Sequence, residues 1–173
     1  MHKIKILLTL IFLSTSLFAL KIGEVPQSIS IYGKKGGMAL DGSRWDSSSI
    51  RDKVFVMFYV DPDEKDTNSH FSDLLKKKKY DRAKYGSIAV VNLAATWKPN
   101  FIIEQLLETK QKDFPDTIYI KDKDKIFVKK WNIADDSSNI LIFSKDGKVL
   151  FYKAGKMTKK DMQKAFSIIE NNL

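Results

Sequence analysis

A short, unbroken apolar segment, Val54–Val60, lies between Asp52 and the Asp61–Pro62 pair. A run of this length, rich in β-branched and aromatic residues and closed by turn-forming residues, is typical of a strand that is buried on both faces. The same kind of run recurs at residues 87–93, and a third strand is predicted at 117–120. Strands buried on both faces indicate a sheet with helices on either side of it.

Helical patterns separate these strands, at residues 65–78 and 100–112. The second helix is expected to bury four aliphatic side chains: Ile102, Ile103, Leu106 and Leu107. Because parallel strands need helical crossovers, the alternation of strands and helices predicts that the central strands are parallel.

The C-terminal part of the chain carries the clearest local signals. Residues 139–143 and 149–152 flank Asp146–Gly147, which is the pattern of a β-hairpin. Thr158 with Asp161 three residues later predicts a capping box at the start of a last helix. That helix has an apolar stripe at helical spacing, formed by Met162, Ala165, Phe166 and Ile169.

Shorter elements are expected nearer the N-terminus and in the middle of the chain. Residues 28–32 alternate in the manner of a short strand, and 33–37 are predicted to form a turn. Residues 125–131 predict a short helix or turn ending in Trp131, whose large ring is expected to pack in the core.

The first 19 residues differ from the rest of the chain. Lys3 and Lys5 precede an apolar run over 6–13, and small and apolar residues continue to Ala19. This pattern predicts a secretory signal peptide at 1–19, cut after Ala19, and a single domain over 20–173. An uncleaved anchor is the alternative, although a spanning helix needs about 20 apolar residues. We therefore expect a periplasmic protein.

Several kinds of chemistry are excluded by composition. The chain of 173 residues contains no cysteine and two histidines, of which His2 falls in the predicted signal peptide and His70 remains. Thiol catalysis, cysteine-ligated metals and sites built from several histidines are therefore excluded. We expect no cofactor.

The net charge is +9, and Lys3 and Lys5 contribute two of these charges. A basic protein outside the cytoplasm meets anionic lipids, wall polymers or acidic proteins rather than nucleic acid. Positive and negative residues alternate over most of the chain, which is also the pattern of a soluble surface. Membrane association remains an alternative, but this alternation favours the soluble interpretation.

The order of elements resembles a thioredoxin-like α/β fold: a central mixed sheet with helices on both faces, then a β-hairpin and a helix. Residues 52–59 (DKVFVMFY) are similar to the first central strand of exported thiol–disulfide reductases, and residues 142–149 (IFSKDGKV) to their hairpin. More closely, residues 91–100 (VNLAATWKPN), Phe114–Pro115 and 135–138 (DDSS) resemble the YtfJ-type family of exported, cysteine-free thioredoxin-like proteins. The resemblance covers residue 22 to the C-terminus and implies fold and compartment more than chemistry.

The chain departs from redox thioredoxins at both parts of the thiol site. Where the strand would run into a CxxC motif, it has 60–64 (VDPDE), and Ser138 stands where a cis-proline would precede the hairpin. The resemblance therefore implies a retained scaffold without thiol chemistry.

Ligands of open α/β sheets bind outside the carboxyl ends of the parallel strands. Here that edge carries Asp61 and Asp63, followed in the chain by Glu64 and Asp66. These carboxylates are weak candidates for a hard-cation site, and the competing interpretation is helix capping. His70 could act as a general base, but a capping or solvent-facing role is the simpler reading.

The remaining candidate binding residues at this edge are Thr96, Trp97, Asn100 and Ser138. Trp97 is either an anchor for a partner or a ring packed over the sheet edge, and Asn100 is either a contact residue or a helix cap.

Three functions remain open. The first is a periplasmic binding or accessory protein that takes a protein or small ligand at the strand-end edge around Trp97. The second is a metal-assisted enzyme that uses Asp61 and Asp63. The third is a membrane- or wall-associated factor that uses the basic surface.

Overall fold

The computed structural model describes residues 20–173, so the predicted signal peptide lies outside the described residues. The strands are β1 (Ser30–Ile31), β2 (Gly36–Met38), β3 (Trp45–Asp46), β4 (Val54–Val60), β5 (Tyr85–Asn92), β6 (Thr117–Asp122), β7 (Ser138–Phe143) and β8 (Val149–Ala154). The α-helices are α1 (Ser69–Lys78), α2 (Asn100–Asp113), α3 (Ile126–Trp131) and α4 (Lys159–Asn172).

A six-stranded mixed sheet runs in the order β2-β6-β5-β4-β7-β8. Strands β4, β5 and β6 are parallel, with Val54 opposite Tyr85 and Val60 opposite Val91 at the two ends of the β4–β5 pair. Strands β2, β7 and β8 are antiparallel to their neighbours. The predicted thioredoxin-like α/β architecture is confirmed.

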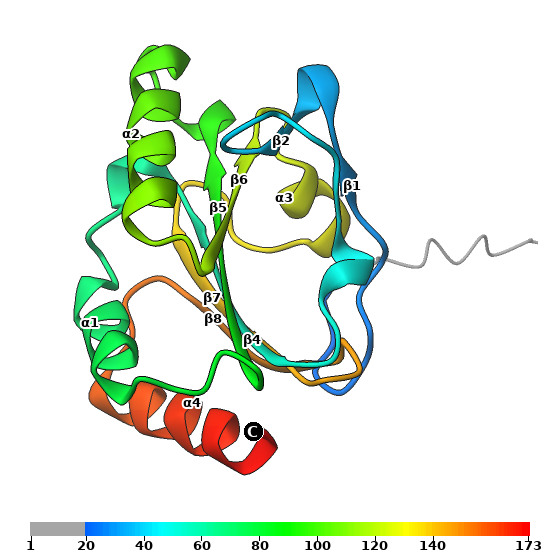
Figure 1. Cartoon of the computed structure of the whole chain (residues 1–173), viewed down its shortest axis with the longest axis vertical. Helices are drawn as coiled ribbons and strands as arrows, with labels where there is room; N and C mark the ends of the chain where they lie inside the picture. Colours follow the sequence, from blue (N-terminus) through cyan, green and yellow to red (C-terminus); the bar gives the residue numbers. More distant parts are fainter. Residues whose placement is uncertain (1–19) are drawn as a thin grey trace, which may run out of the picture.

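Each face of the sheet buries its own cluster because successive side chains of a strand point to opposite faces. Val54 and Val56 of β4 pack with α1 and α4, while Met57 and Tyr59 pack with α3 and the N-terminal segment. Figure 1 shows α1, α2 and α4 on one side of the sheet and α3 with β1 on the other. Trp131 is 1% exposed, which confirms its predicted place in the core.

The C-terminal predictions are confirmed in detail. β7 and β8 form the hairpin on either side of Asp146–Gly147. Thr158 Oγ1 accepts the amide of Asp161, and the Asp161 carboxylate accepts the amide of Thr158, so the capping box is complete.

Three predictions near the edges of elements were wrong. The 33–37 segment is not only a turn, since Gly36 begins β2, an edge strand paired with β6. Only glycine fits there, because a Cβ on Gly36 would lie 1.8 Å from the carbonyl oxygen of Lys121. The helix expected over 65–78 begins at Ser69, because the chain first makes a 3-10 turn at Pro62–Glu64.

The third error concerns α2. Ile103 and Leu107 are buried against the sheet as predicted, whereas Ile102 is 43% exposed and Leu106 is 57% exposed. Neighbouring helix positions differ by about 100° in direction, so one helix face cannot bury both members of each pair.

No helix within residues 20–173 is long and apolar enough to cross a bilayer.

Candidate functional site

The carboxyl ends of the parallel strands form the edge at which a ligand was expected, and Asp61 follows β4 directly. Its amide donates to the carbonyl of Ser137, and its Oδ1 accepts the amide of Asp63 at 2.8 Å. Asp61 is 4% exposed. Burial, and to a smaller degree the carboxylates of Asp63 and Asp136, raise the pKa of the Asp61 carboxyl.

The carboxylate of Asp63 is used differently. It forms an ion pair with Lys98 and accepts the hydroxyl of Thr96 at 3.0 Å. The hydrogen bond from Lys98, followed by that from Thr96, lowers the pKa of Asp63. These contacts tie the 3-10 turn after β4 to the loop before α2.

Asp61 and Asp63 therefore do not form a ready cation site. Their carboxylates have separate partners, and within residues 20–173 no group of three or more histidine, aspartate or glutamate side chains could hold a metal ion. The capping interpretation fits Asp61, whose side chain caps the 3-10 turn.

Ser138 lies inside a buried polar seam. It is 2% exposed, and its hydroxyl accepts the side-chain amide of Asn68 at 2.9 Å. The same amide donates to the carbonyl of Gly155 at 3.1 Å, and the Asn68 oxygen accepts the amide of Met157 at 2.8 Å. Asn68 thus joins the segment before α1 to the start of β7 and to the segment that follows β8. Because Ser138 is buried, its hydroxyl is not accessible to a ligand.

Asn68 carries no local sequence signal of its burial. It stands beside Thr67 and Ser69 in a polar stretch, where an asparagine is ordinarily a surface residue. His70 is held in the same region, with its Nε2 3.0 Å from the carbonyl oxygen of Met157, a backbone contact rather than a pairing with a nucleophile.

A second polar cluster is formed by Asn92 at the end of β5, Lys125 before α3 and Asp135 before β7. Lys125 contacts Asp135 at 2.6 Å, and Asn92 donates to Asp135 at 3.0 Å. Burial opposes ionisation of Asp135, but the bonds from Lys125, Asp136 and Asn92 lower its pKa overall. Asn92 is fully buried, and its side-chain oxygen has no hydrogen-bond partner in the structure. Lys125 also escaped prediction, because its partners Asp135 and Asp136 lie beyond α3 and are brought back to it only by the fold.

Trp97 is the most exposed large hydrophobic residue in the described chain, at 86%. It therefore does not pack over the sheet edge. Asn100 does not cap α2 either, because Pro99 occupies the N-cap position and no side-chain cap bond is made. Of the predicted site residues, Trp97 and Asn100 face solvent, Thr96 is half-buried, and Asp61 and Ser138 are buried.

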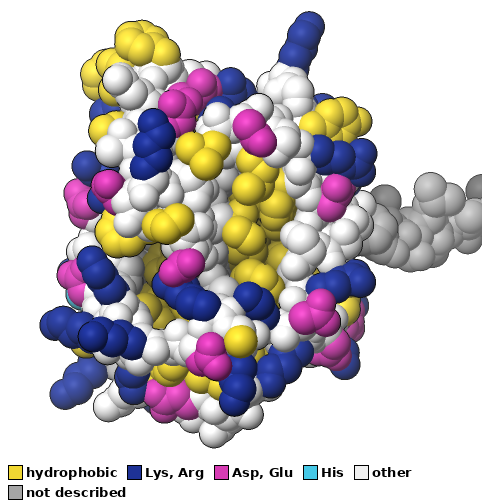
Figure 2. Space-filling view, viewed as in Figure 1, with side chains coloured by type: hydrophobic (Ala, Val, Ile, Leu, Met, Phe, Trp, Pro, Cys, Tyr) yellow, Lys and Arg dark blue, Asp and Glu magenta, His cyan; other side chains and the backbone are white. Residues whose placement is uncertain are grey.

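The exposed ring of Trp97 continues onto the outer side of α2. Phe101 is 70% exposed, and Ile102 and Leu106, which point in other directions from the solvent-facing half of the helix, are 43% and 57% exposed. We call these four residues, Trp97, Phe101, Ile102 and Leu106, the α2 outer face. Figure 2 shows hydrophobic side chains gathered on the surface over the N-terminal end of α2. Such aromatic and aliphatic exposure is typical of a protein contact surface.

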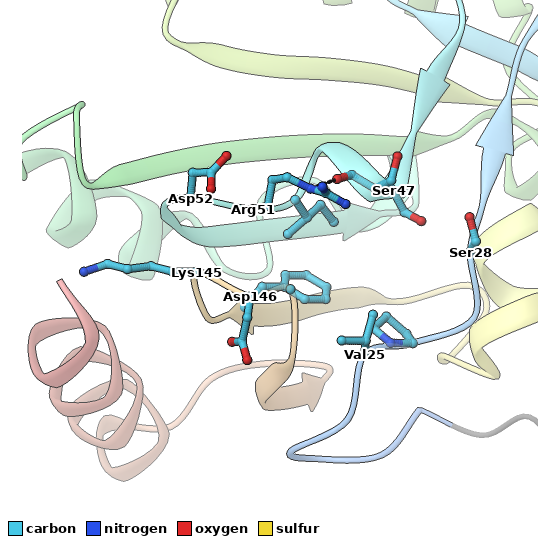
Figure 3. A pocket seen from close by; sticks show the side chains of 12 residues that line it. Val25, Ser28, Ser47, Arg51, Asp52, Lys145 and Asp146 are labelled. Carbon is cyan, nitrogen blue, oxygen red and sulfur yellow. Dashed lines mark hydrogen bonds between the residues drawn. The ribbon is translucent and has the colours of Figure 1, made fainter.

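A pocket of about 460 Å³ lies at the opposite end of the sheet, between the N-terminal segment and the β7–β8 turn (Figure 3). Arg51 and Val25 border it, but Arg51 Nε already donates to the carbonyl of Ser48 at 2.6 Å. Lys145 reaches the carbonyl of Leu173, and Asp146 pairs with Lys148. The charged groups around this pocket do not converge on a common point.

A model of a family described as "Bacterial protein of unknown function (YtfJ_HI0045)" matches residues 27–172. The chain is 23% identical over 147 residues to YtfJ of Escherichia coli (strain K12), with 80% of each chain covered. It is 25% identical over 129 residues to an uncharacterized protein of Haemophilus influenzae, covering 72% of this chain and 70% of that one.

Solved structures similar to the chain share its fold. The exposed lipoprotein thioredoxin of Streptococcus pneumoniae gives a TM-score of 0.56 at 15% identity, covering 77% of this chain and 97% of that one. A peroxiredoxin-like protein of Aquifex aeolicus gives 0.60 at 11% identity, covering 90% and 89%. The fold is thus thioredoxin-like, and the absence of cysteine removes thiol chemistry from it. On the match over residues 27–172, the chain belongs to the YtfJ_HI0045 family of bacterial proteins.

Proposed function

We propose that this protein is an exported binding protein that takes a partner protein on the α2 outer face, beside the strand-end edge, and performs no thiol–disulfide exchange. The observation that carries the proposal is the exposure of Trp97 and Phe101, at 86% and 70%, at the N-terminal end of α2. Aromatic side chains dominate the energy of protein interfaces, and leaving them in water is unfavourable.

The polar groups at the strand ends support a binding role rather than a catalytic one. Asp63 is neutralised by Lys98, and Asp135 is paired with Lys125. Ser138 is buried beneath Asn68. The contacts of Asp63 with Lys98 and Thr96 hold the loop that carries Trp97, and an ordered contact surface lowers the entropic cost of association.

The export part of the proposal is supported by the sequence of residues 1–19, with their basic start and short apolar run. Cell fractionation followed by N-terminal sequencing of the purified protein tests it. A mature chain that begins at Leu20 in the periplasmic fraction is expected. A chain that begins at Met1 in the cytoplasmic fraction would contradict it.

Site-specific photo-crosslinking in living cells tests the binding role. A photoreactive residue replaces Phe101, and in a control variant it replaces Ile22, which is 62% exposed and lies outside the α2 outer face. We expect a crosslinked protein species from position 101 and none from position 22. No species at position 101, or the same species from both positions, would refute the proposed contact surface.

A further inference from the structure

Two lysines from different helices converge on one aromatic ring where α1 and α2 end. Lys76 of α1 and Lys110 of α2 place their Nζ atoms 4.9 Å and 5.6 Å from the ring centroid of Phe114. Both distances are within the range of a cation–π contact, which extends to about 6 Å. The fold therefore holds two like charges, distant in sequence, around a side chain that is itself 36% exposed.

These two ammonium groups have no carboxylate partner within residues 20–173, and neither do the neighbouring Lys77 and Lys79. All four side chains are exposed, and Figure 2 shows Lys and Arg side chains gathered over α1. We call Lys76, Lys77, Lys79 and Lys110 the lysine surface. Because like charges repel, cations gathered in this way favour an anion from outside the chain.

The end of α1 adds a second observation. Lys79 follows the helix with a φ of 48°, in the left-handed region where glycine is preferred because it has no Cβ. A cation thus stands where the backbone favours glycine, and such a break in a local rule is typical of a functional position. Lysines also complement the dipole at a helix C-terminus. That effect does not explain why Lys76 and Lys110 share one ring, since each would complement its own helix equally well apart.

The kind of cation indicates the kind of anion. Arginine binds one carboxylate or phosphate through a fixed pair of hydrogen bonds, whereas lysine is a flexible point charge. The lysine surface contains no arginine, and Arg82 is already 3.6 Å from Asp116. None of its residues lines the pocket of Figure 3. An open group of point charges beside a partly exposed ring fits an array of mobile phosphates better than one small ligand.

We propose that the lysine surface binds the anionic headgroups of a phospholipid bilayer, with the C-terminal ends of α1 and α2 facing the membrane. Phe114 then enters the headgroup region between Lys76 and Lys110, as aromatic residues of membrane-surface proteins do. The inference goes beyond the proposed function and uses different residues. Helix α2 has 14 residues and is about 20 Å long, so Trp97 and Phe101 at its other end stay available to a partner protein.

Cosedimentation of the purified protein with vesicles of phosphatidylglycerol and phosphatidylethanolamine tests the proposal, and phosphatidylcholine vesicles provide the neutral surface. Each lysine near an anionic bilayer raises the partition coefficient about fivefold at low salt, so Lys76→Gln with Lys110→Gln should lower it about 25-fold. Lys34→Gln with Lys35→Gln is the matched control, because it changes the net charge equally at exposed lysines in the turn before β2. It should leave the binding nearly unchanged.

A dye reports which side of the protein meets the lipid. The chain contains no cysteine, so one introduced cysteine carries an environment-sensitive dye at a chosen position. Pro115→Cys places the dye beside Phe114, and Ile22→Cys places it at a residue that is 62% exposed and lies outside the lysine surface. We expect nitroxide-labelled headgroups to quench the dye at position 115 and not at position 22. Circular dichroism verifies that each variant is folded.

The outcomes are distinct. No binding to anionic vesicles at low salt, an equal loss in both double variants, or equal quenching at positions 115 and 22 would each overturn the inference. Binding of soluble polyphosphate that depends on Lys76 and Lys110, without binding of vesicles, would replace the bilayer by a soluble polyanion. The crosslink from position 101 tests the proposed function separately, since the lysine variants should retain it. Its loss in the parent protein would contradict the proposed function and leave the lysine surface unaffected.

Discussion

Asn68 provides the sharpest test of how the strand-end edge is held together. The side chain is 3% exposed and makes three hydrogen bonds, to Ser138, Gly155 and Met157. Replacement by alanine removes all three and leaves a buried amide and a buried carbonyl without partners. Each such bond contributes about 1 kcal/mol, and each group left unsatisfied raises the cost further. We therefore expect Asn68→Ala to lower the free energy of unfolding by about 3 to 5 kcal/mol.

Urea unfolding followed by tryptophan emission and far-ultraviolet circular dichroism measures this change, because Trp45 and Trp131 are buried reporters. The slope of free energy against urea should stay the same, since the denatured chain exposes the same surface. In a domain of this size the loss corresponds to a fall of about 10 °C or more in the thermal midpoint.

Two companion variants make the reasoning refutable. Ser138→Ala removes one of the three partners and should cost about 1 kcal/mol. Asn171→Ala removes an exposed asparagine of α4 whose single contact, to Ser167, is 3.4 Å long, and should have almost no effect. If Asn68→Ala costs less than about 1 kcal/mol, or no more than Asn171→Ala, the buried seam does not join these segments as argued.

Three further changes test other parts of the structure. Gly86→Ala places a Cβ 2.2 Å from the ring of buried Phe55, so we expect a loss of about 1 to 3 kcal/mol in thermal or urea unfolding, and an unchanged midpoint would be contrary evidence. Thr158→Ala breaks the capping box of α4 and should cost about 1 kcal/mol by the same assay, whereas Ser167→Ala in mid-helix should be neutral or stabilising. Burial raises the pKa of Asp61 in the folded protein. The protein therefore loses stability as the pH rises from about 4, the pKa of Asp61 in the unfolded chain, through its higher pKa in the folded protein. Asp61→Asn keeps an acceptor for the Asp63 amide, so the variant should be more stable than the parent near neutral pH, and this gain should vanish in acid; a gain that is independent of pH would contradict the assignment.

The elements that sequence analysis predicted well are those whose signals are local. Asp146–Gly147 selects a tight hairpin whatever surrounds it, and Thr158 with Asp161 closes a capping box within one turn. The central strand Val54–Val60 is recognisable because its whole length is apolar. In each case the determining interactions lie within a few residues of one another.

The features that escaped prediction depend on contacts distant in sequence. β2 exists because Gly36 lets the backbone approach β6, which a glycine-rich stretch alone does not reveal. Asn68 becomes a core residue only because Gly155 and Met157 fold over it. The adjacent pairs Ile102–Ile103 and Leu106–Leu107 give α2 two faces that could be buried. Only the position of β5 and β6 selects the face that carries Ile103 and Leu107.

The strand-end edge and α2 together support the proposal that this scaffold, which lacks thiol chemistry, acts by binding. At the edge, Asp61, Asp63 and Asp135 are each committed to a contact within the chain, so little polar capacity remains for a substrate beyond the free oxygen of Asn92. On α2 the balance is reversed, since Phe101 and Leu106 are apolar and are 70% and 57% exposed. Folding buries only the smaller part of these two side chains. Their burial in a complex is therefore the interaction that the proposed contact supplies, and the single change Leu106→Glu separates that role from the stability of the fold.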